Sequence, residues 1–306
     1  MRGFGATAAA LVLLIGLGAC SGGDNAEPGV SPDPSTSAPA DGEVVDRSAE
    51  LAAVEEQHDV RLGVYAIDTG SGDRIEQRAD ERFAFASTFK ALLVGALVEE
   101  RSVSVLELSV PISEDDLVAY APQVEAALAE GRTSMTVGEL ADATVRFSDN
   151  AAGNLLLQQI GGPSGFQAAL RAVGDDVTNS SRTEPGLNEA TPGDDRDTTT
   201  PRAIADTLAY FAVDGAAPEN REVLVDLMLR NTTGDALIRA GVPGDWQVAD
   251  KTGSGGYGTR NDIAVVWPPG RDPIVVAILT SRDDEDADTV DAAVADAMRV
   301  VSEAFA

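Results

Sequence analysis

Two kinds of hydrophobic pattern run along this chain, and they occupy different parts of it. Residues 61–86, "RLGVYAIDTGSGDRIEQRADERFAFA", predict a β-hairpin, because apolar and polar positions alternate in the first strand and Gly-Ser-Gly follows as a turn. Three further strands are predicted in residues 245–255, 259–269 and 272–281, with Pro-Pro-Gly at 268–270 as a turn. Strands therefore come from both ends of the globular part.

Helical periodicity dominates the rest of the chain. It is clear in residues 46–59, which start with Asp46, and in residues 288–306, which have a cap-like start. Residues 87–230 consist mostly of helical patterns separated by Gly and Pro. The simplest architecture is an α+β fold of the α/β sandwich type. One antiparallel sheet is covered by the terminal helices and lies beside an inserted all-helical lobe, with a cleft between them.

The first residues predict export. Residues 1–19 combine a basic Arg2 with an apolar run too short for a spanning helix, which is typical of a signal peptide. Cys20 follows Leu-Gly-Ala and resembles the lipidated cysteine of bacterial lipoproteins; as the only cysteine it excludes an intramolecular disulfide. Residues 20–45 are rich in Gly, Pro, Ser and Asp and predict a disordered tether. The globular domain is predicted at 46–306, on the outer side of the cell membrane, or secreted if Cys20 is not lipidated.

Charge and histidine content exclude several classes of function. The chain has 51 acidic and 22 basic residues, a net charge of -29, which repels nucleic acids and anionic lipids. Its one histidine, His58, lies in the first predicted helix, far from any motif. A Ser-His-Asp hydrolase and a multi-histidine metal site are therefore disfavoured, and no metal or cofactor is expected. If the chain is a nucleophilic enzyme, its base is Lys, Glu or Asp.

Lysine is rare here and its positions are informative. The chain has only two lysines, Lys90 and Lys251, among 22 basic residues. A lysine ammonium can lose its proton when it is desolvated, whereas an arginine guanidinium effectively never does. In Ser87-Thr88-Phe89-Lys90 the spacing places Ser87 and Lys90 on one helix face, and a helix N-terminus near Ser87 would favour its alkoxide. Lys251-Thr252-Gly253 offers a cation and a hydroxyl beside glycines that let a ligand approach the backbone.

Two more motifs complete a set. Ser148-Asp149-Asn150 stands between two helical patterns, where helix capping is the simplest explanation and Asn150 is a candidate first helical residue. Together with the two lysine motifs, in this order, it resembles the penicillin-recognising serine enzymes. The stretch "SRTEPGLNEATPGDDRDTTTP" further resembles the omega loop of class A β-lactamases. It contains Glu184, and DD-peptidases of this superfamily lack the corresponding glutamate. The resemblance covers the chain from about residue 46 onward.

This resemblance implies a mechanism and its residues. Ser87 would attack the β-lactam carbonyl, with Lys90 and Glu184 as alternative bases, and Glu184 with Asn188 would activate the deacylating water. Ser148 would pass a proton to the leaving nitrogen, helped by Lys251, and the backbone N–H groups of Ser87 and Ser254 would bind the oxyanion.

The resemblance also implies residues that hold the loop and the substrate. Arg182 and Asp197 match a salt bridge that holds the omega loop in place. The implied substrate-binding residues are Tyr120, Asn150, Asn188, Lys251, Thr252, Gly253, Ser254 and Arg260.

The leading hypothesis is thus a monomeric, lipid-anchored class A serine β-lactamase acting on penicillins and cephalosporins. Its alternatives are a DD-peptidase on the same scaffold and a β-lactam sensor that is acylated without turnover. Both are disfavoured by Glu184, and a sensor would usually carry a transmembrane signalling segment. A purely structural lipoprotein is disfavoured because both lysines fall in motifs.

Overall fold

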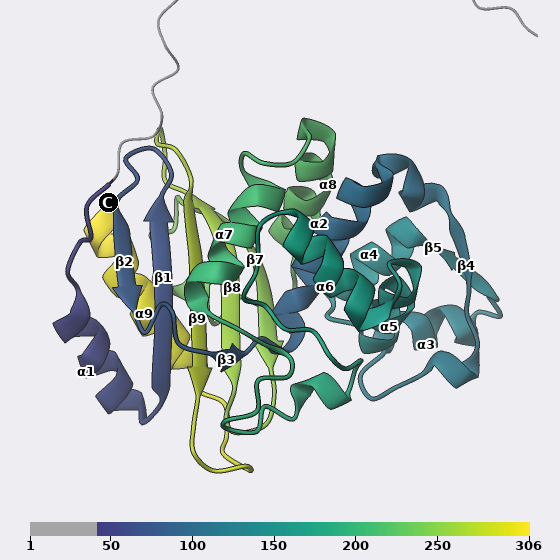
Figure 1. The fold of residues 1–306 in the computed structure, drawn as a ribbon, viewed down its shortest axis with the longest axis horizontal. Helices are drawn as coiled ribbons and strands as arrows, with labels where there is room; N and C mark the ends of the chain where they lie inside the picture. Colours follow the sequence, from purple (N-terminus) through teal and green to yellow (C-terminus); the bar gives the residue numbers. More distant parts are fainter. Residues whose placement is uncertain (1–41) are drawn as a thin grey trace, which may run out of the picture. The chain divides into compact units, whose positions relative to one another are not determined.

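The computed structural model describes residues 42–306, and an open antiparallel sheet lies beside a lobe of helices (Figure 1). The sheet has five strands in the order β2-β1-β9-β8-β7, so chain segments from both ends pair with one another. β1 pairs with β9 along its whole length, from Arg61 opposite Ser281 to Asp68 opposite Ile274. The strands are β1 (Arg61–Asp68), β2 (Arg74–Gln77), β7 (Gln247–Ser254), β8 (Arg260–Trp267) and β9 (Ile274–Ser281).

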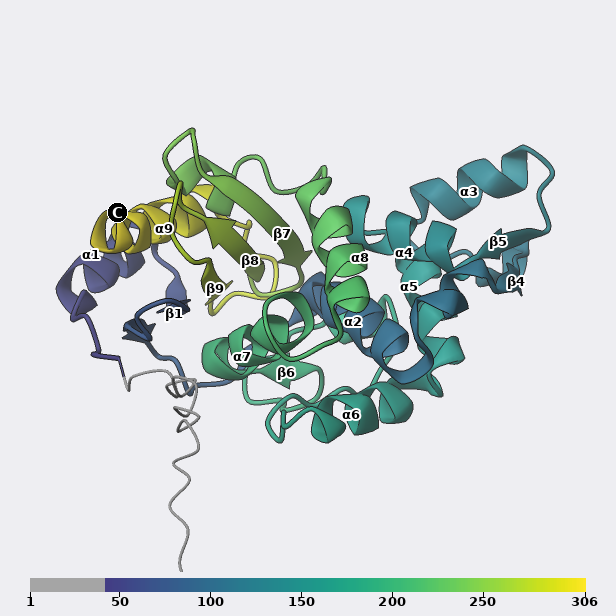
Figure 2. The same cartoon turned by 90° about the horizontal axis from the view of Figure 1, so that it is seen from above.

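Both faces of this sheet are covered, which explains why its central strands are apolar almost throughout. In β9 every residue from Ile274 to Thr280 is buried. The terminal helices α1 (Ser48–His58) and α9 (Asp291–Phe305) pack on one face with their own hydrophobic cluster. A larger hydrophobic cluster joins the other face to α7 (Pro201–Ala212) and the helical lobe. Figure 2 shows α7 beside the sheet, seen from above.

The helical lobe is built around α2 (Phe89–Arg101). Its residues from Phe89 to Val98 are all buried and, apart from Lys90, none of them is polar, as expected for a helix in the middle of a core. The surrounding helices are α3 (Pro122–Ala129), α4 (Val137–Arg146), α5 (Asn150–Gln159), α6 (Gly162–Ala172) and α8 (Pro218–Leu229). Two short ladders complete the domain, β3 (Phe83–Ala84) with β6 (Thr198–Thr199), and β4 (Ser109–Pro111) with β5 (Ser134–Thr136).

The predicted fold class is confirmed: an antiparallel sheet with terminal helices lies beside a helical lobe. One detail of the prediction needs correction: α9 follows Val290 and has no side-chain cap, and the Ala293 N–H donates to Val290 O instead. The predicted capping before Asn150 is confirmed, because α5 begins at Asn150 and the Asp149 carboxylate accepts from the N–H of Ala152.

The predicted N-terminal segments lie mostly outside the described residues. This holds for the signal peptide at 1–19, for Cys20 and for the tether up to residue 41. Residues 42–45, also assigned to the tether, are bound to the sheet: Arg74 N–H donates to Glu43 O at 2.8 Å and Val45 N–H to Arg74 O at 2.7 Å. The chain is therefore ordered a few residues earlier than predicted, along the free side of β2.

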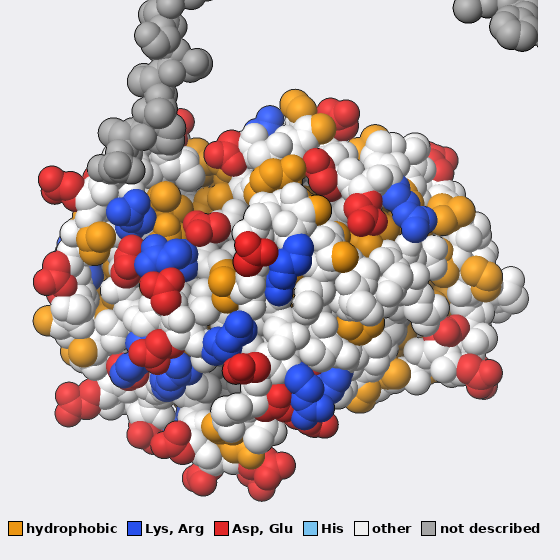
Figure 3. All heavy atoms as spheres, in the orientation of Figure 1, with side chains coloured by type: hydrophobic (Ala, Val, Ile, Leu, Met, Phe, Trp, Pro, Cys, Tyr) orange, Lys and Arg blue, Asp and Glu red, His pale blue; other side chains and the backbone are white. Residues whose placement is uncertain are grey.

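Charged side chains of both signs are mixed on the surface. On the face in Figure 3, arginines lie among carboxylates and do not form a separate basic patch. Arg202, for example, contacts both Glu76 and Asp80 at 2.8 Å. Among residues 42–306, no helix is both long and apolar enough to cross a membrane.

Candidate active site

Ser87 lies on a strained turn directly before α2. A short 3-10 helix, Ala86–Thr88, carries it, and Ala86 has a left-handed φ of 45°, which is uncommon for a residue with a side chain. The buried Asn261 holds the chain just before this turn, because its side-chain amide donates to Ala84 O at 2.8 Å. Ser87 therefore sits ahead of the α-helix and does not open it, but Lys90 still lies one turn further on.

Lys90 is fully buried and connects the elements of the site. Its Nζ lies 3.0 Å from Ser87 Oγ, 3.0 Å from Glu184 Oε1, 2.8 Å from Ser148 O and 2.5 Å from Asn150 Oδ1. Burial lowers the pKa of Lys90, and the neighbouring Glu184 carboxylate acts in the opposite direction. The Lys90 amine is thus held beside the Ser87 hydroxyl, from which it can take a proton when it is neutral and to which it can give one when it is charged.

Glu184 reaches the nucleophile from the omega loop. Ser87 Oγ donates to Glu184 Oε1 at 3.3 Å, and Asn188 Nδ2 donates to the other carboxylate oxygen. The peptide bond between Glu184 and Pro185 is cis. Asn188 Oδ1 is buried and has no hydrogen-bond partner within residues 42–306. A donor molecule bound between these groups would meet an acceptor on each side.

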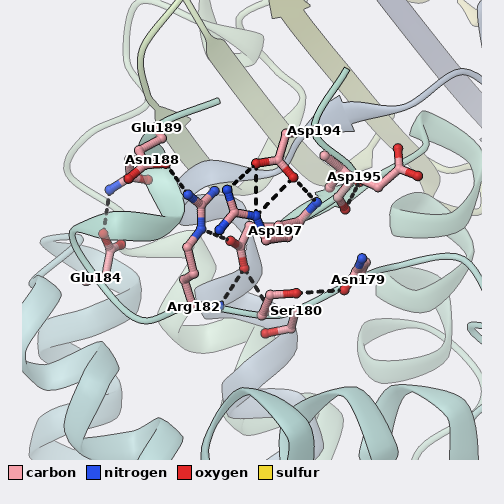
Figure 4. Close-up of polar contacts among 12 residues, drawn as sticks. Asn179, Ser180, Arg182, Glu184, Asn188, Glu189, Asp194, Asp195 and Asp197 are labelled. Carbon is pink, nitrogen blue, oxygen red and sulfur yellow. Dashed lines mark hydrogen bonds and ion pairs between the residues drawn. The ribbon is translucent and has the colours of Figure 1, made fainter. Parts of the chain in front are cut away.

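The omega loop is held by charge, as Figure 4 shows. Arg182 Nε contacts Asp197 Oδ2 at 2.5 Å, which places the predicted ion pair in the structure. Asp197, fully buried, also accepts from the backbone N–H groups of Ser181 and Arg182 at 2.8 and 3.0 Å. Arg182 Nη1 pairs with Glu189 in the same loop. The buried Asp197 thus holds the start of the segment that carries Glu184, whereas the Glu189 pair lies at the more exposed side of the loop.

The opposite wall of the site is β7. Lys251, also fully buried, donates to Ser148 Oγ at 3.1 Å and to Thr252 O at 2.8 Å. Burial, together with the positive charge of Lys90, lowers the pKa of Lys251 to about 7. Gly253 permits this close packing, because a Cβ there would lie 3.0 Å from Phe85 O and 3.2 Å from Ser87 N.

A cavity of about 400 Å³ opens between the two walls. Thr252 Oγ1 lies 2.6 Å from Thr233 Oγ1, and Arg260 Nη1 donates to Ser254 Oγ at 2.7 Å, so hydroxyls and a guanidinium gather at one end. Tyr120, 61% exposed, stands at the rim. The cavity is lined by Ser87, Tyr120, Ser148, Asn150, Asn188, Thr233, Thr252, Gly253, Ser254 and Arg260.

The structure brings every sequence-predicted site residue of the globular domain to this cavity or to the contacts just behind it. Their individual roles stay predictions. His58 lies elsewhere, 2.6 Å from Asp296 between α1 and α9, as its separation from the motifs indicated.

Sequence reasoning missed three residues that position the site. Asn154 Nδ2 donates to Glu184 O and Asn154 Oδ1 accepts from Glu184 N, both at 2.9 Å. Its signal was available, as a polar residue one turn after Asn150 in an otherwise apolar run. Thr233 lines the cavity, and Asp291 holds Arg260 Nε at 2.6 Å. Neither had a local signal, since both come from segments far from the motifs that they meet.

Comparison with known proteins agrees with this geometry. Residues 46–305 match the sequence model of the "Beta-lactamase enzyme family". The chain is 53% identical over 257 residues to a beta-lactamase of Bacillus licheniformis, covering 84% of this chain and 83% of that protein. It is 55% identical to a beta-lactamase of Amycolatopsis lactamdurans, covering 82% of each.

Solved structures are similar as well. A halotolerant bacterial beta-lactamase is 51% identical, with a TM-score of 0.81 over 84% of this chain and 98% of that one. A class A beta-lactamase of Clostridium kluyveri is 43% identical, with a TM-score of 0.82 over the same shares.

Proposed function

The chain belongs to the class A β-lactamases, and from this premise we propose how its own side chains divide the reaction. It hydrolyses the β-lactam ring of penicillins and cephalosporins through a serine acyl-enzyme, and so confers resistance to them. The observation that carries the division of labour is the contact of one serine hydroxyl with a buried lysine and a buried glutamate at once.

In acylation, Ser87 Oγ forms a bond to the lactam carbonyl carbon as its proton moves to a neighbouring base. Lys90 Nζ at 3.0 Å and Glu184 Oε1 at 3.3 Å are both within reach of that proton. The C–N bond then breaks, and Ser148 Oγ gives its proton to the leaving nitrogen. The proton that the base took from Ser87 passes on to Ser148, which restores both groups before deacylation. Ser148 is bound to Lys251 at 3.1 Å, a cation that stabilises its developing negative charge.

In deacylation, Glu184 removes a proton from a water that attacks the ester carbon. Asn188 supports this role, since its amide orients the Glu184 carboxylate and leaves a buried carbonyl oxygen to accept from the water. The ester bond to Ser87 breaks, and the proton returns to its Oγ. A general base of this kind contributes about 10² to 10⁴ in rate.

Substrate recognition falls to the sheet wall. β-Lactams of these classes carry a carboxylate, for which Thr252, Thr233 and Arg260 supply donors at one end of the cavity. The Asn150 amide would bind the substrate side chain, and Tyr120 would cover it at the rim. The backbone N–H groups of Ser87 and Ser254 would form the oxyanion hole.

Glu184→Ala tests the assignment. With a chromogenic cephalosporin, the wild type should turn over steadily, whereas the variant should give one stoichiometric burst and an adduct on Ser87 visible by mass spectrometry. The matched control is Glu189→Ala, which removes a more exposed carboxylate from the same loop and should clear its adduct. Rapid clearance by Glu184→Ala would refute the role of Glu184. A wild type that also gives a single burst would support the DD-peptidase or sensor alternative.

For location, we propose export and lipidation of Cys20, with the enzyme acting as a monomer outside the cell membrane. The support is the sequence of residues 1–20, with its basic start, apolar run and terminal Cys. Radiolabelled palmitate should enter the wild type in cells and not Cys20→Ser, which should be recovered from the medium. An unlabelled wild type that is also released would contradict the anchor.

A further inference from the structure

Two fully buried aspartates lie side by side in the sheet behind the recognition residues, and the mechanism uses neither. Asp250 belongs to β7 and Asp262 to β8. Thr252 is the residue directly opposite Asp262, and Asp250 comes two positions before Thr252. Since side chains two positions apart share a face, Asp250 and Asp262 are diagonal neighbours on the same face.

Their partners differ sharply. Asp250 contacts Arg239 Nε at 2.6 Å with one oxygen and Asn231 Nδ2 at 2.6 Å with the other. Asp262 Oδ2 accepts only from the N–H of Ile238, at 3.1 Å, and its Oδ1 is buried without any partner within residues 42–306. No Lys, Arg or His of this described part lies within ion-pair distance of Asp262. An unpaired carboxylate in such a place is strongly disfavoured, so the group keeps a proton instead.

We propose that Asp262 is a neutral carboxylic acid in the folded enzyme at neutral pH, and that its O–H donates toward Asp250. As a positioning residue, it thereby limits the negative charge behind Lys251 to one carboxylate. Asp250 is the suitable acceptor, because each carboxylate oxygen has a second lone pair after its bond to Arg239 or Asn231. The proton stays on Asp262 because Asp250 has the cation.

The charges around the pair agree with this assignment. Asp250 and Lys251 face Asp262 from β7, Arg260 lies on its own strand, and the segment Ile238–Gly241 brings Arg239 and the Ile238 N–H. Burial, and next the charge of Asp250, raise the pKa of Asp262. Arg260 and Lys251 act in the opposite direction, but neither forms an ion pair with it, and Arg260 is already bound to Asp291.

The consequence falls on Lys251, so this part of the inference rests on the function proposed for that residue. The pKa of Lys251 is lowered to about 7 by burial and by Lys90, and carboxylates nearby raise it. Asp262 is one of these carboxylates, so a negative charge there would raise the pKa of Lys251. With Asp262 neutral, the pKa of Lys251 is lower, and Lys251 loses its charge beside Ser148 at a lower pH.

Asp262→Asn is the decisive variant, since Asn keeps the size, an acceptor for Ile238 N–H and a donor toward Asp250, but cannot ionise. An acid with a raised folded pKa holds one more proton in the folded than in the unfolded state, so wild-type stability falls as pH rises through that window. The variant lacks this loss. The melting temperature of Asp262→Asn minus that of the wild type should therefore increase by about 2 to 4 °C for each pH unit above pH 4.

Two readouts separate this from a merely structural role. The pH profile of kcat/KM should have the same midpoint in Asp262→Asn as in the wild type, because no charge has been removed. A midpoint shifted to lower pH would show that wild-type Asp262 was charged, and a melting difference that is flat or falls with pH would overturn the proposal too. The melting series does not depend on the reaction, so its failure is distinguishable from failure of the proposed function.

Asp197→Asn is the matched control, because Asp197 is equally buried but paired with Arg182. Asp197→Asn should melt at a lower temperature than the wild type at neutral pH, and this difference should not turn into a stabilisation as the pH rises. If Asp262→Asn does not fold, infrared spectra of wild-type enzyme with labelled aspartate decide the matter. The C=O band of a protonated aspartic acid is expected at pH 7, and its absence would overturn the proposal.

Discussion

The two walls of the cleft each contain one of the chain's two lysines, and both lysines are fully buried. On the helical wall, Lys90 lies 3.0 Å from the carboxylate of Glu184. On the sheet wall, Lys251 donates to a hydroxyl and a carbonyl, and no carboxylate of residues 42–306 pairs with it. Within residues 42–306, Lys90 therefore has a counter-ion and Lys251 has none.

The difference indicates a division of work. A lysine beside a glutamate and a serine belongs to a chain of groups that can exchange protons. A lysine without a counter-ion leaves its charge available to an anionic substrate and to the hydroxyl of Ser148. Replacement by arginine, which keeps charge and removes proton exchange, should therefore affect the two walls unequally.

The largest effect is expected for Lys90→Arg. Acylation should slow by about 10² to 10⁴, because arginine does not release a proton and a larger guanidinium must fit where Lys90 is fully buried. Stopped-flow measurement of the burst with a chromogenic cephalosporin gives the rate, and thermal unfolding checks the fold. A folded variant that acylates at the wild-type rate would remove proton exchange from the helical wall.

The next effect concerns the omega loop of the same wall. Asp197→Asn leaves Arg182 and two backbone N–H groups without their carboxylate, which should cost about 3 to 5 kcal/mol of unfolding free energy. Deacylation should slow more than acylation, since Glu184 follows Arg182 closely. Single-turnover kinetics separate the two steps, with Glu189→Gln as the control at the exposed pair. Unchanged deacylation would mean that the ion pair does not hold Glu184.

A smaller effect is expected for Lys251→Arg and depends on pH. The pKa of Lys251 is about 7, so its charge is present below that pH and is lost above it. For an anionic cephalosporin the wild-type KM should therefore rise above pH 7, and in Lys251→Arg it should stay flat. An ester of the same substrate, without the carboxylate, serves as the control. Parallel profiles in the two enzymes would assign the recognising charge to Arg260 instead.

The smallest effect tests net charge against local charge. A protein of net charge -29 repels an anionic substrate at long range, whereas the cations of the cleft attract it at short range. Salt screens exposed charges more than buried ones, so kcat/KM should rise by roughly twofold to threefold between low and physiological ionic strength. A fall in kcat/KM with increasing ionic strength would show that the cations of the cleft outweigh the net negative charge even at long range.

Local patterns were enough to predict the strands, the terminal helices and the motif residues. Ser87 and Lys90 could be placed together because helix geometry fixes a spacing of three. Glu184 was identified from the resemblance of residues 181–201 to an omega loop, and not from helix or strand geometry. Asn154 was missed since its partners are the backbone atoms of Glu184, 30 residues away. Asp262 could not be distinguished from an ordinary strand aspartate, because its missing partner is a property of the packed interior.

The position of residues 43–45 against β2 has a mechanical consequence. The sheet order is β2-β1-β9-β8-β7, so the chain enters at one edge while Lys251 lies on the strand at the other. A pull on the chain ahead of residue 43 loads first the few backbone hydrogen bonds to Arg74. Those bonds can be broken one after another while three strands separate the loaded edge from β7. Tension on the N-terminal segment is therefore expected to open this edge of the sheet before it reaches Lys251 on β7.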